Sequence, residues 1–456
     1  MSGPRTSVPA LSVMEASAIV VGIVVGIGIF KTPPIVAANV ESEFAFICLW
    51  LIGGLLTVVG ALCYAELGAA RPHAGGEYHY LSEAYGHGLG FLFGWGRMTV
   101  MQTGAIAAVA FAYGDYAATV ISLGSSGSAI HAAIAVTVVA GLQLAGTQIS
   151  SRVQVALTVL TVVLLAVVAV SGFIAAQVDA APQAVSTQSK GAAGLALVFI
   201  LLTYGGWNEA AYLSGEIRDP KRNVLRVLLT GTGIVTALYL LINIALVLSV
   251  GLGGLREKKL VTEPVEAVFG PLGVAAVAVI VCVAALSTLN GTMFTGARSI
   301  LALGQNFTLL SRFGEINQRS GAPKNAIIVQ AIIALGLIGL GATTRDGFTA
   351  MVEYTAPTFW MFMALVGFSL FIFRWREPDH PMPFRVPLYP LVPIVFCATA
   401  VYLVHASIAY TGLGALVGLA ILASGMPLYW FGRRRELRAP MRGNPLPAPS
   451  SSIGDT

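Results

Sequence analysis

The chain has 456 residues, of which 56% are hydrophobic and only 10% are charged. A soluble domain carries about 25% charged residues because its surface faces water, so this composition excludes a set of soluble domains and predicts a polytopic membrane protein. The formal net charge of +5 does not indicate a nucleic-acid partner, because basic residues in a membrane protein gather in cytoplasmic loops and set its topology.

Apolar runs long enough to cross a lipid bilayer as helices fill most of the chain. Such a helix needs about 20 residues, and twelve runs are predicted to span the membrane. They lie at 12–38, 43–70, 90–121, 130–148, 153–175, 191–214, 225–251, 271–305, 325–342, 347–373, 388–409 and 412–431. Residues 1–11 form a polar cytoplasmic start, and 432–456 are predicted to be a disordered cytoplasmic tail, rich in Pro and Ser toward its end.

Lysine and arginine residues decide the predicted orientation. With both termini inside the cell, most of them fall in cytoplasmic loops, as the positive-inside rule requires. The outer loops receive only Lys31, Lys190, Arg256, Lys258, Lys259 and Arg345. We therefore expect a multi-pass protein of the plasma or inner membrane with both termini in the cytoplasm.

The first span is predicted to be interrupted near its middle. It reads VVGIVVGIGIF over residues 20–30 and continues to Pro33-Pro34. A glycine costs a helix about 1 kcal/mol relative to alanine, and unwound backbone inside a membrane survives only beside a cavity or a ligand. The alternative is close helix packing through Gly22 and Gly26, whose spacing is that of a small-residue helix interface.

The sixth span carries a second glycine interruption. It reads LLTYGGWNE over residues 201–209. Each interrupted span begins a set of five helices, and such segments at corresponding places in two halves indicate a transporter site. A helix N-terminus offers N–H groups to a carboxylate, and freed carbonyls accept an ammonium. The predicted substrate is therefore a zwitterion, foremost a free α-amino acid.

Four motifs, in order along the chain, make this sequence similar to a known family. GIGIF at 26–30 resembles the GSGIF motif of the amino acid/polyamine/organocation (APC) superfamily, and RPHAGGEYHYL at 71–81 resembles its first cytoplasmic loop. YGGWN at 204–208 resembles the span-six motif of the L-type amino acid transporter branch, and PFRVPLYP at 383–390 is similar to a further family signature. The resemblance covers about residues 12–432 and implies an amino acid permease.

The resemblance also implies the fold. It implies an all-α membrane protein of LeuT-like architecture, in which two inverted five-helix repeats at 12–175 and 191–373 are followed by two extra helices at 388–431. Such a protein works by alternating access, with neutral L-amino acids as the first expectation for its substrates.

Substrate contacts follow from matching the family motifs residue by residue. The α-carboxylate is expected at the backbone N–H groups of Ile27 and Gly28, which follow the motif's Gly26. The α-ammonium is expected at the carbonyls of Val24, Leu202 and Gly205. Three further side chains match positions in or near the family's site: Tyr204, Asn208 and Trp360.

Three positions depart from the family pattern. Ile27 replaces the motif serine, and Leu202 stands where the L-type branch has a bulky aromatic gating residue. Thr161 stands where many sodium-independent members have a lysine, so coupling to H⁺ or to Na⁺ stays open. Ser287 and Thr288 lie near the place where a family sodium site would draw hydroxyls. Packing, or bonding back to their own helix, is the alternative for both.

Ionisable residues inside predicted spans are functional hypotheses by default. Glu209, directly after the second interruption, has three interpretations: it binds the amine of a basic substrate, it carries a proton, or it pairs with a polar neighbour. The second interpretation accords with proton coupling, and the first with a cationic amino acid or polyamine substrate. Glu66 is predicted to pair with Arg71, and Asp115 is predicted to lie at a solvated helix end.

Other functional classes lack their residues. A membrane-embedded enzyme, the remote alternative, would need a catalytic set such as HExxH or GxSxG, and none occurs. The histidines are scattered, so no metal site or cofactor is expected. Heterodimers of the L-type branch use an extracellular cysteine between spans three and four, and the loop at 122–128 has none. No disulfide-linked heavy subunit is therefore expected. The expected contacts are the amino acid and the lipid bilayer.

Overall fold

A computed structural model of the chain describes residues 11–73, 75–178, 193–257, 270–344, 346–411 and 413–438. Across these residues the fold is helical, and the only β-type pairing is an isolated bridge between Leu11 and Ile217. The last helix continues to Arg438, so the prediction of a disordered tail is wrong for residues 432–438. The remainder of that tail and residues 1–10 lie outside the described residues.

Twenty helical elements follow one another along the described chain. They are α1 (Val13–Val24), α2 (Gly28–Ala37), α3 (Glu43–Ala70), α4 (Glu77–Tyr85), α5 (His87–Gly96), η1 (Arg97–Met101), α6 (Gln102–Val120), α7 (Gly127–Ala145), α8 (Thr147–Val178), α9 (Ala193–Thr203), η2 (Trp207–Glu209), α10 (Ala210–Leu213), α11 (Pro220–Glu257), α13 (Pro271–Asn306), η3 (Thr308–Gly314), α14 (Lys324–Gly341), α15 (Gly347–Arg376), α16 (Leu391–Thr411), α17 (Leu413–Ala423) and α18 (Gly425–Arg438).

Among the described residues, nine helices are long and apolar enough to cross a membrane, or ten if the bent pair of α1 and α2 is one span. The other two predicted spans are divided. The span predicted at 90–121 consists of α5, the π-helix η1 and α6, and the span predicted at 191–214 consists of α9 followed by the short η2 and α10. Large apolar side chains also point outward along the long helices, as lipid contact requires. Examples are Leu55, Val138, Val163, Ile332 and Leu416.

Polar side chains fix where several helices begin. Ser12 caps α1 in a capping box with Glu15, whose backbone N–H donates to the serine hydroxyl at 3.2 Å. Ser42 caps α3, and Asp346 caps α15 by accepting from the N–H of Thr349. These caps satisfy N–H groups that the first turn of a helix leaves without partners.

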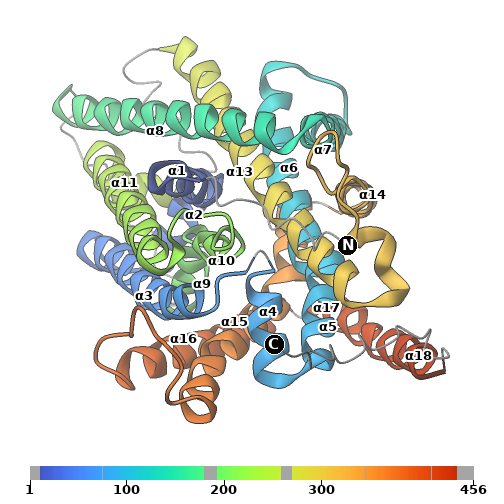
Figure 1. The fold of residues 1–456 in the computed structure, drawn as a ribbon. Helices are drawn as coiled ribbons and strands as arrows, with labels where there is room; N and C mark the ends of the chain where they lie inside the picture. The colour runs from blue at the N-terminus through green and yellow to red at the C-terminus, as the bar shows by residue number, and fades with distance from the viewer. Residues whose placement is uncertain are drawn as a thin grey trace, which may run out of the picture.

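The first helix lies inside the bundle. Figure 1 shows α1 and α2 enclosed between α8, α11 and α13, and α1 packs against each of those three helices. Helices α15 and α16 pack together, and α16 also packs on α3. Residues of α1 such as Ile19, Val20 and Val21 are buried, so this part of α1 is enclosed by neighbouring helices.

Both predicted interruptions are present. Helix α1 ends at Val24 and α2 begins at Gly28, with a bend of 48° between them. Helix α9 ends at Thr203, and Gly206 adopts a left-handed conformation with φ +106° before η2 begins. A Cβ atom on Gly206 would lie 2.9 Å from the side chain of Ile23, so the two interruptions touch and only glycine fits there.

The predicted partner of Glu66 is wrong. Its carboxylate accepts two hydrogen bonds from the Arg374 guanidinium, at 2.7 and 2.6 Å, and a third from the backbone N–H of Val386. Arg71, the expected partner, instead pairs with Glu83 and Glu377. The interpretation of Glu66 as structural is retained, because this bidentate pair ties the end of α15 to α3.

Candidate functional site

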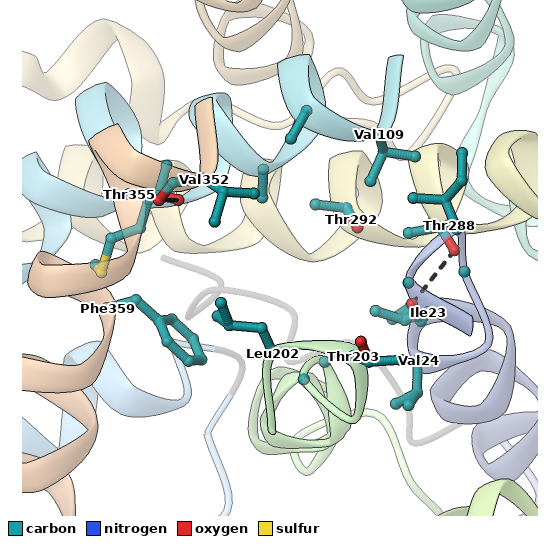
Figure 2. Close-up of a pocket in the computed structure, with 18 of the residues that line it drawn as sticks. Ile23, Val24, Val109, Leu202, Thr203, Thr288, Thr292, Val352, Thr355 and Phe359 are labelled. Carbon is teal, nitrogen blue, oxygen red and sulfur yellow. Dashed lines mark hydrogen bonds between the residues drawn. The ribbon is translucent and has the colours of Figure 1, made fainter. Parts of the chain in front are cut away.

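A cavity lies where the two helix interruptions meet η1, α6, α13 and α15 (Figure 2). Its volume is about 210 Å³, and a cavity of about 150 Å³ in another protein holds benzene, so the space suits a small molecule. The lining residues are Ile23, Val24, Gly26, Ile27, Gly28, Thr32, Arg97, Met101, Gln102, Ala105, Ala108, Val109, Phe199, Leu202, Thr203, Gly205, Gly206, Asn208, Glu209, Thr288, Thr292, Phe348, Val352, Thr355, Ala356 and Phe359.

Apolar side chains surround the middle of the cavity. Figure 2 shows Leu202 of α9 and Phe359 of α15 on neighbouring walls, with Val109 and Val352 on the wall formed by α6 and α15. Leu202 lies at the position where the L-type branch has a bulky aromatic gating residue, so the sequence predicted that this chain has no aromatic ring there. The aromatic rings in the cavity wall come instead from Phe199 of α9 and from Phe348 and Phe359 of α15.

Unpaired backbone donors face the cavity at the start of α2. Ile27 and Gly28 line the cavity, and among the described residues their N–H groups make no backbone or side-chain hydrogen bond. The carbonyl of Ile27 already accepts from Phe30 and Lys31, which begin the helical ladder of α2. Free N–H groups together with the positive end of the helix dipole form a site for a carboxylate.

The three carbonyls predicted to receive an ammonium differ in availability. The carbonyl of Val24 accepts from the Gly26 N–H at 2.7 Å and from the Tyr239 hydroxyl at 2.8 Å. The carbonyl of Leu202 accepts from the Gly205 N–H at 3.0 Å. The carbonyl of Gly205 accepts no hydrogen bond within the described part of the chain, so it is the freest acceptor of the three.

Tyr239 of α11 connects the two interruptions, a role that the sequence analysis did not predict. Its buried hydroxyl lies 2.8 Å from the carbonyl of Val24 and 3.2 Å from that of Thr203. A second link joins the hydroxyls of Thr32 and Thr203, which are 2.7 Å apart. These contacts hold the unwound segments at a fixed separation.

Tyr239→Phe is expected to weaken substrate binding and to lower stability by about 1–3 kcal/mol, because it leaves two buried carbonyls without that donor. The apparent melting temperature of the solubilised protein and the affinity for substrate would measure both effects. Tyr85→Phe is the matched control, since it also removes a tyrosine-to-carbonyl bond, to Leu365, but lies away from the cavity. Equal losses of affinity in the two variants would contradict this role.

Gly22 and Gly26 have different roles, since Gly22 serves close helix packing and Gly26 belongs to the helix interruption. A Cβ atom on Gly22 would lie 2.0 Å from the Thr158 hydroxyl and 2.4 Å from the Gln154 amide nitrogen, so Gly22 serves close packing of α1 on α8. Gly26 instead lies in the interruption and lines the cavity, where its own Cβ would lie 2.7 Å from the Thr288 hydroxyl. Close packing and chain interruption are therefore both present, at glycines four residues apart.

The hydroxyls of α13 bond across to α1. Thr288 donates to the carbonyl of Gly22 at 3.2 Å and to that of Ile23 at 3.3 Å, and Ser287 donates to Gly22 at 3.3 Å. Figure 2 shows the bond between Thr288 and Ile23. The alternative of bonding back to their own helix is therefore wrong for both. Thr288 lines the cavity, whereas Ser287 lies behind it.

Gln154, rather than Thr161, is the residue of the fifth span beside the first. The Gln154 amide donates to the Ser287 hydroxyl at 3.0 Å and accepts from Asn290 at 2.9 Å. The buried hydroxyl of Thr161 has no hydrogen-bond partner among the described residues and does not line the cavity. The position matched to a family lysine is therefore not the polar contact point in this chain.

Two residues predicted to contact the substrate lie outside the cavity wall. Tyr204 is fully buried and donates to the Trp50 carbonyl at 3.2 Å. Trp360 is buried on another side of α15, and its ring packs edge-on against Phe359 with centroids 5.0 Å apart. Phe359 itself lines the cavity. Val24, Gly26, Ile27, Gly28, Leu202, Gly205, Asn208, Glu209 and Thr288 are brought together there.

Glu209 forms an ion pair that the sequence did not identify. Its carboxylate lies 2.6 Å from the Arg97 guanidinium, and both side chains are buried and line one end of the cavity. Arg97 is also 3.4 Å from Glu77 of α4, and its guanidinium stacks on the Tyr212 ring. Of the three interpretations of Glu209, the structure shows the third, in which the carboxylate pairs with a polar neighbour, here Arg97. A lone arginine within a predicted apolar span was the available signal.

A π-helical segment places Arg97 at the cavity. Residues 97–101 form η1, between α5 and α6, and such insertions in helices are frequent at functional sites. Directly after it, the Gln102 amide donates to the Thr292 carbonyl of α13 at 2.6 Å. The segment and the residue that follows it therefore carry a guanidinium and an amide to the cavity wall.

A second ion pair lies at the opposite end of the bundle. Asp115 pairs with Lys31 of α2 at 2.7 Å and accepts from Ser128. It is 18 residues after Arg97 along η1 and α6, which at the rise of an α-helix corresponds to about 27 Å. The carboxylate is 41% exposed, so the expected solvated helix end is accompanied by a partner from the interrupted first span.

Comparison with known proteins identifies similar chains. The family model described as amino acid permease matches residues 11–431. The b(0,+)-type amino acid transporter 1 of Homo sapiens is 30% identical over 408 residues, which are 87% of this chain and 82% of that protein. The serine/threonine exchanger SteT of Bacillus subtilis is 29% identical over 437 residues, covering 93% and 97%. The large neutral amino acids transporter small subunit 2 of Homo sapiens is 28% identical over 439 residues, covering 92% and 80%.

Proposed function

The chain belongs to the amino acid permease family, and from this premise we propose that it moves neutral L-amino acids across the plasma membrane by alternating access. The observation that carries the proposal is the start of α2. There the unpaired N–H groups of Ile27 and Gly28 share one cavity with the unoccupied carbonyl of Gly205. Donors and acceptors so arranged suit the carboxylate and ammonium of one α-amino acid.

The architecture we propose has twelve spans with both termini in the cytoplasm. Spans one and six are the interrupted pairs, and 12–175 and 191–373 are the inverted repeats, followed by 388–431. Contact between the two interruptions at Gly206 and Ile23 supports this arrangement, because repeat-built carriers place both interrupted helices at the substrate.

A neutral substrate is favoured over a cationic one by Arg97. The Glu209 carboxylate would otherwise be the natural partner of a basic side chain, but a fixed guanidinium lies 2.6 Å from it. A cationic substrate would have to displace the Arg97 guanidinium, and this would leave a buried charge without its partner, which is energetically costly. Small neutral amino acids are also the substrates in the name of the serine/threonine exchanger of Bacillus subtilis, so exchange of serine-like substrates is our first expectation.

We infer that sodium does not drive this transport. A sodium site between the first and eighth spans would draw its oxygen ligands from Ser287 and Thr288. Both hydroxyls are donating to carbonyls of α1, and the Gln154 amide nitrogen stands 3.0 Å from the Ser287 oxygen. The N–H donor of Gln154 therefore lies beside Ser287, where a sodium ion would need to bind.

We further propose that the carrier acts without a disulfide-linked partner. Its four cysteines are Cys48, Cys63, Cys282 and Cys397. Each lies within a long helix, and two of them are buried. The loop between α6 and α7 contains none.

Counterflow in proteoliposomes tests the proposed function. Vesicles loaded with unlabelled serine should take up labelled serine, alanine or threonine, and the uptake should be the same in sodium and in choline medium. Labelled arginine and lysine should compete weakly. Absence of counterflow for every neutral amino acid, or a strong preference for arginine, would overturn the proposal.

A further inference from the structure

One threonine hydroxyl in the cavity wall has no hydrogen-bond partner. Thr292 of α13 lines the cavity, and its side-chain oxygen forms no hydrogen bond among the described residues. Figure 2 shows this oxygen pointing into the cavity. Threonine hydroxyls in helices commonly bond back to a carbonyl of the preceding turn. A hydroxyl that is free and faces a cavity is therefore available to a ligand.

The other threonine hydroxyls of the cavity wall are already paired. Thr288 donates to two carbonyls of α1, and the hydroxyls of Thr32 and Thr203 lie 2.7 Å apart. Thr355 of α15 donates at 3.0 Å to a carbonyl one turn back in its own helix. Within the part of the chain that the structure describes, Thr292 is thus the threonine of this wall whose hydroxyl is left for a substrate.

An amide side chain lies against the same residue. The Gln102 amide nitrogen donates to the Thr292 carbonyl at 2.6 Å and lies 3.4 Å from the Thr295 hydroxyl. Because both contacts need the nitrogen, they fix the orientation of the amide. Its oxygen accepts no hydrogen bond from the described residues, and Gln102 also lines the cavity. The wall therefore offers a hydroxyl, which can donate, next to an amide oxygen, which can only accept.

This polar pair lies one helical turn from the place expected to hold the substrate backbone. Thr288 touches the first interruption, since a Cβ atom on Gly26 would lie 2.7 Å from the Thr288 hydroxyl. Thr292 follows four residues later on α13, about 6 Å along the helix. An amino acid whose carboxylate and ammonium bind at the interruptions therefore needs only a short side chain to reach Thr292.

We propose that Thr292 and Gln102 recognise a hydroxyl group on the substrate side chain, so that this carrier prefers serine and threonine to alanine and valine. A substrate hydroxyl would accept from Thr292 and donate to the Gln102 oxygen, which satisfies all three groups at once. An apolar side chain would cover both protein groups and leave them without partners, which is unfavourable. The assignment rests on the proposed transport of neutral amino acids and adds the feature that selects among them.

Competition in proteoliposomes tests the assignment. Counterflow of labelled serine is measured first, because its absence for every neutral amino acid would overturn the transport function itself. Serine is then compared with alanine as a competitor, and threonine with valine, since each pair differs chiefly by one hydroxyl group. The hydroxylated member should bind about threefold to tenfold more tightly, as one hydrogen bond between neutral groups provides. Intact counterflow with equal competition within both pairs would overturn the assignment alone.

Thr292→Val is the decisive variant, because it keeps the shape of the side chain and removes the hydroxyl. The preference for serine over alanine should fall to a ratio of about one. Thr355→Val is the matched control, since it removes a hydroxyl of the same cavity wall that is already bonded within its own helix, and it should keep the preference. Thr292→Ser retains the hydroxyl and should keep the preference too. Persistence in Thr292→Val, or equal loss in Thr355→Val, would overturn the role of Thr292.

Binding to the solubilised protein gives the same comparison without transport. A ligand that binds the folded protein raises its apparent melting temperature, so serine should raise it more than alanine does at equal concentration. That difference should vanish in Thr292→Val. Gln102→Met removes the acceptor and should reduce the difference, whereas an unchanged difference would exclude Gln102 from the recognition of the hydroxyl.

A side-chain amide also combines a donor with an acceptor, so one further pair of competitors separates it from a hydroxyl. Asparagine and leucine are similar in size, and only asparagine carries an amide. Discrimination within this pair alone, with none between serine and alanine or between threonine and valine, would overturn the assignment to a hydroxyl.

Discussion

Gly28→Val is expected to abolish substrate binding. A Cβ atom at position 28 would lie 2.8 Å from the Thr203 methyl group and 3.0 Å from its Cα atom, so the new side chain meets both a side chain and the backbone of α9. It would also cover the N–H groups that the α-carboxylate is expected to use. Binding of labelled serine to the solubilised protein would fall below detection.

Gly233→Val is the matched control for this prediction. Gly233 also lies within a long helix, α11, but a Cβ atom there would meet no other atom within 4 Å. Both variants should give a monodisperse protein of similar size, and only Gly28→Val should lose binding. Retention of normal affinity in Gly28→Val would remove the start of α2 from the site.

Arg97→Met is expected to be among the most destabilising single substitutions in the chain. It leaves Glu77 and Glu209 buried close together with no cation between them. Removing one partner of a buried ion pair costs about 3–5 kcal/mol. The apparent melting temperature of the solubilised protein should fall sharply. Lys31→Met provides the control, because its partner Asp115 is 41% exposed and such pairs contribute only about 0–1 kcal/mol.

A double variant separates charge from packing at this position. Arg97→Met combined with Glu209→Gln should regain part of the lost stability, since the carboxylate without a partner is then neutral. The coupling between the two substitutions measures their pairwise interaction. Equal instability of the single and the double variant would mean that Arg97 acts through its stacking on Tyr212 instead.

Residues whose role depends on local backbone chemistry were predictable from the sequence. Clustered glycines weaken a helix, and together with the family motifs they predicted the interruptions before Gly28 and at Gly206 where they occur. Composition and apolar run length predicted a helical membrane protein for the same reason, because each depends on neighbouring residues alone. The motif match also brought Leu202 and Asn208 to the cavity that contains Gly28.

Residues whose role depends on the face of a helix were harder to assign. Trp360 was expected in the site, but the adjacent Phe359 lines the cavity. One residue along a helix is a rotation of about 100°, and hydropathy cannot fix that rotation when every face of the helix is apolar. Thr161 and Gln154 are a different case, because they lie seven residues apart on α8, about two turns, and so share nearly the same face. They differ in their level along the helix, and packing decides which level meets α13.

Long-range pairing was decided by the tertiary structure alone. The sequence by itself determined the membrane class, the helical fold, the family and the two interrupted helices. It paired Glu66 with nearby Arg71, whereas the fold brings Arg374 to it across 308 positions. The sequence likewise did not identify Arg97 as the partner of Glu209. Charges buried in a membrane must find partners, but which partner is near depends on how distant helices pack, and no local pattern records that.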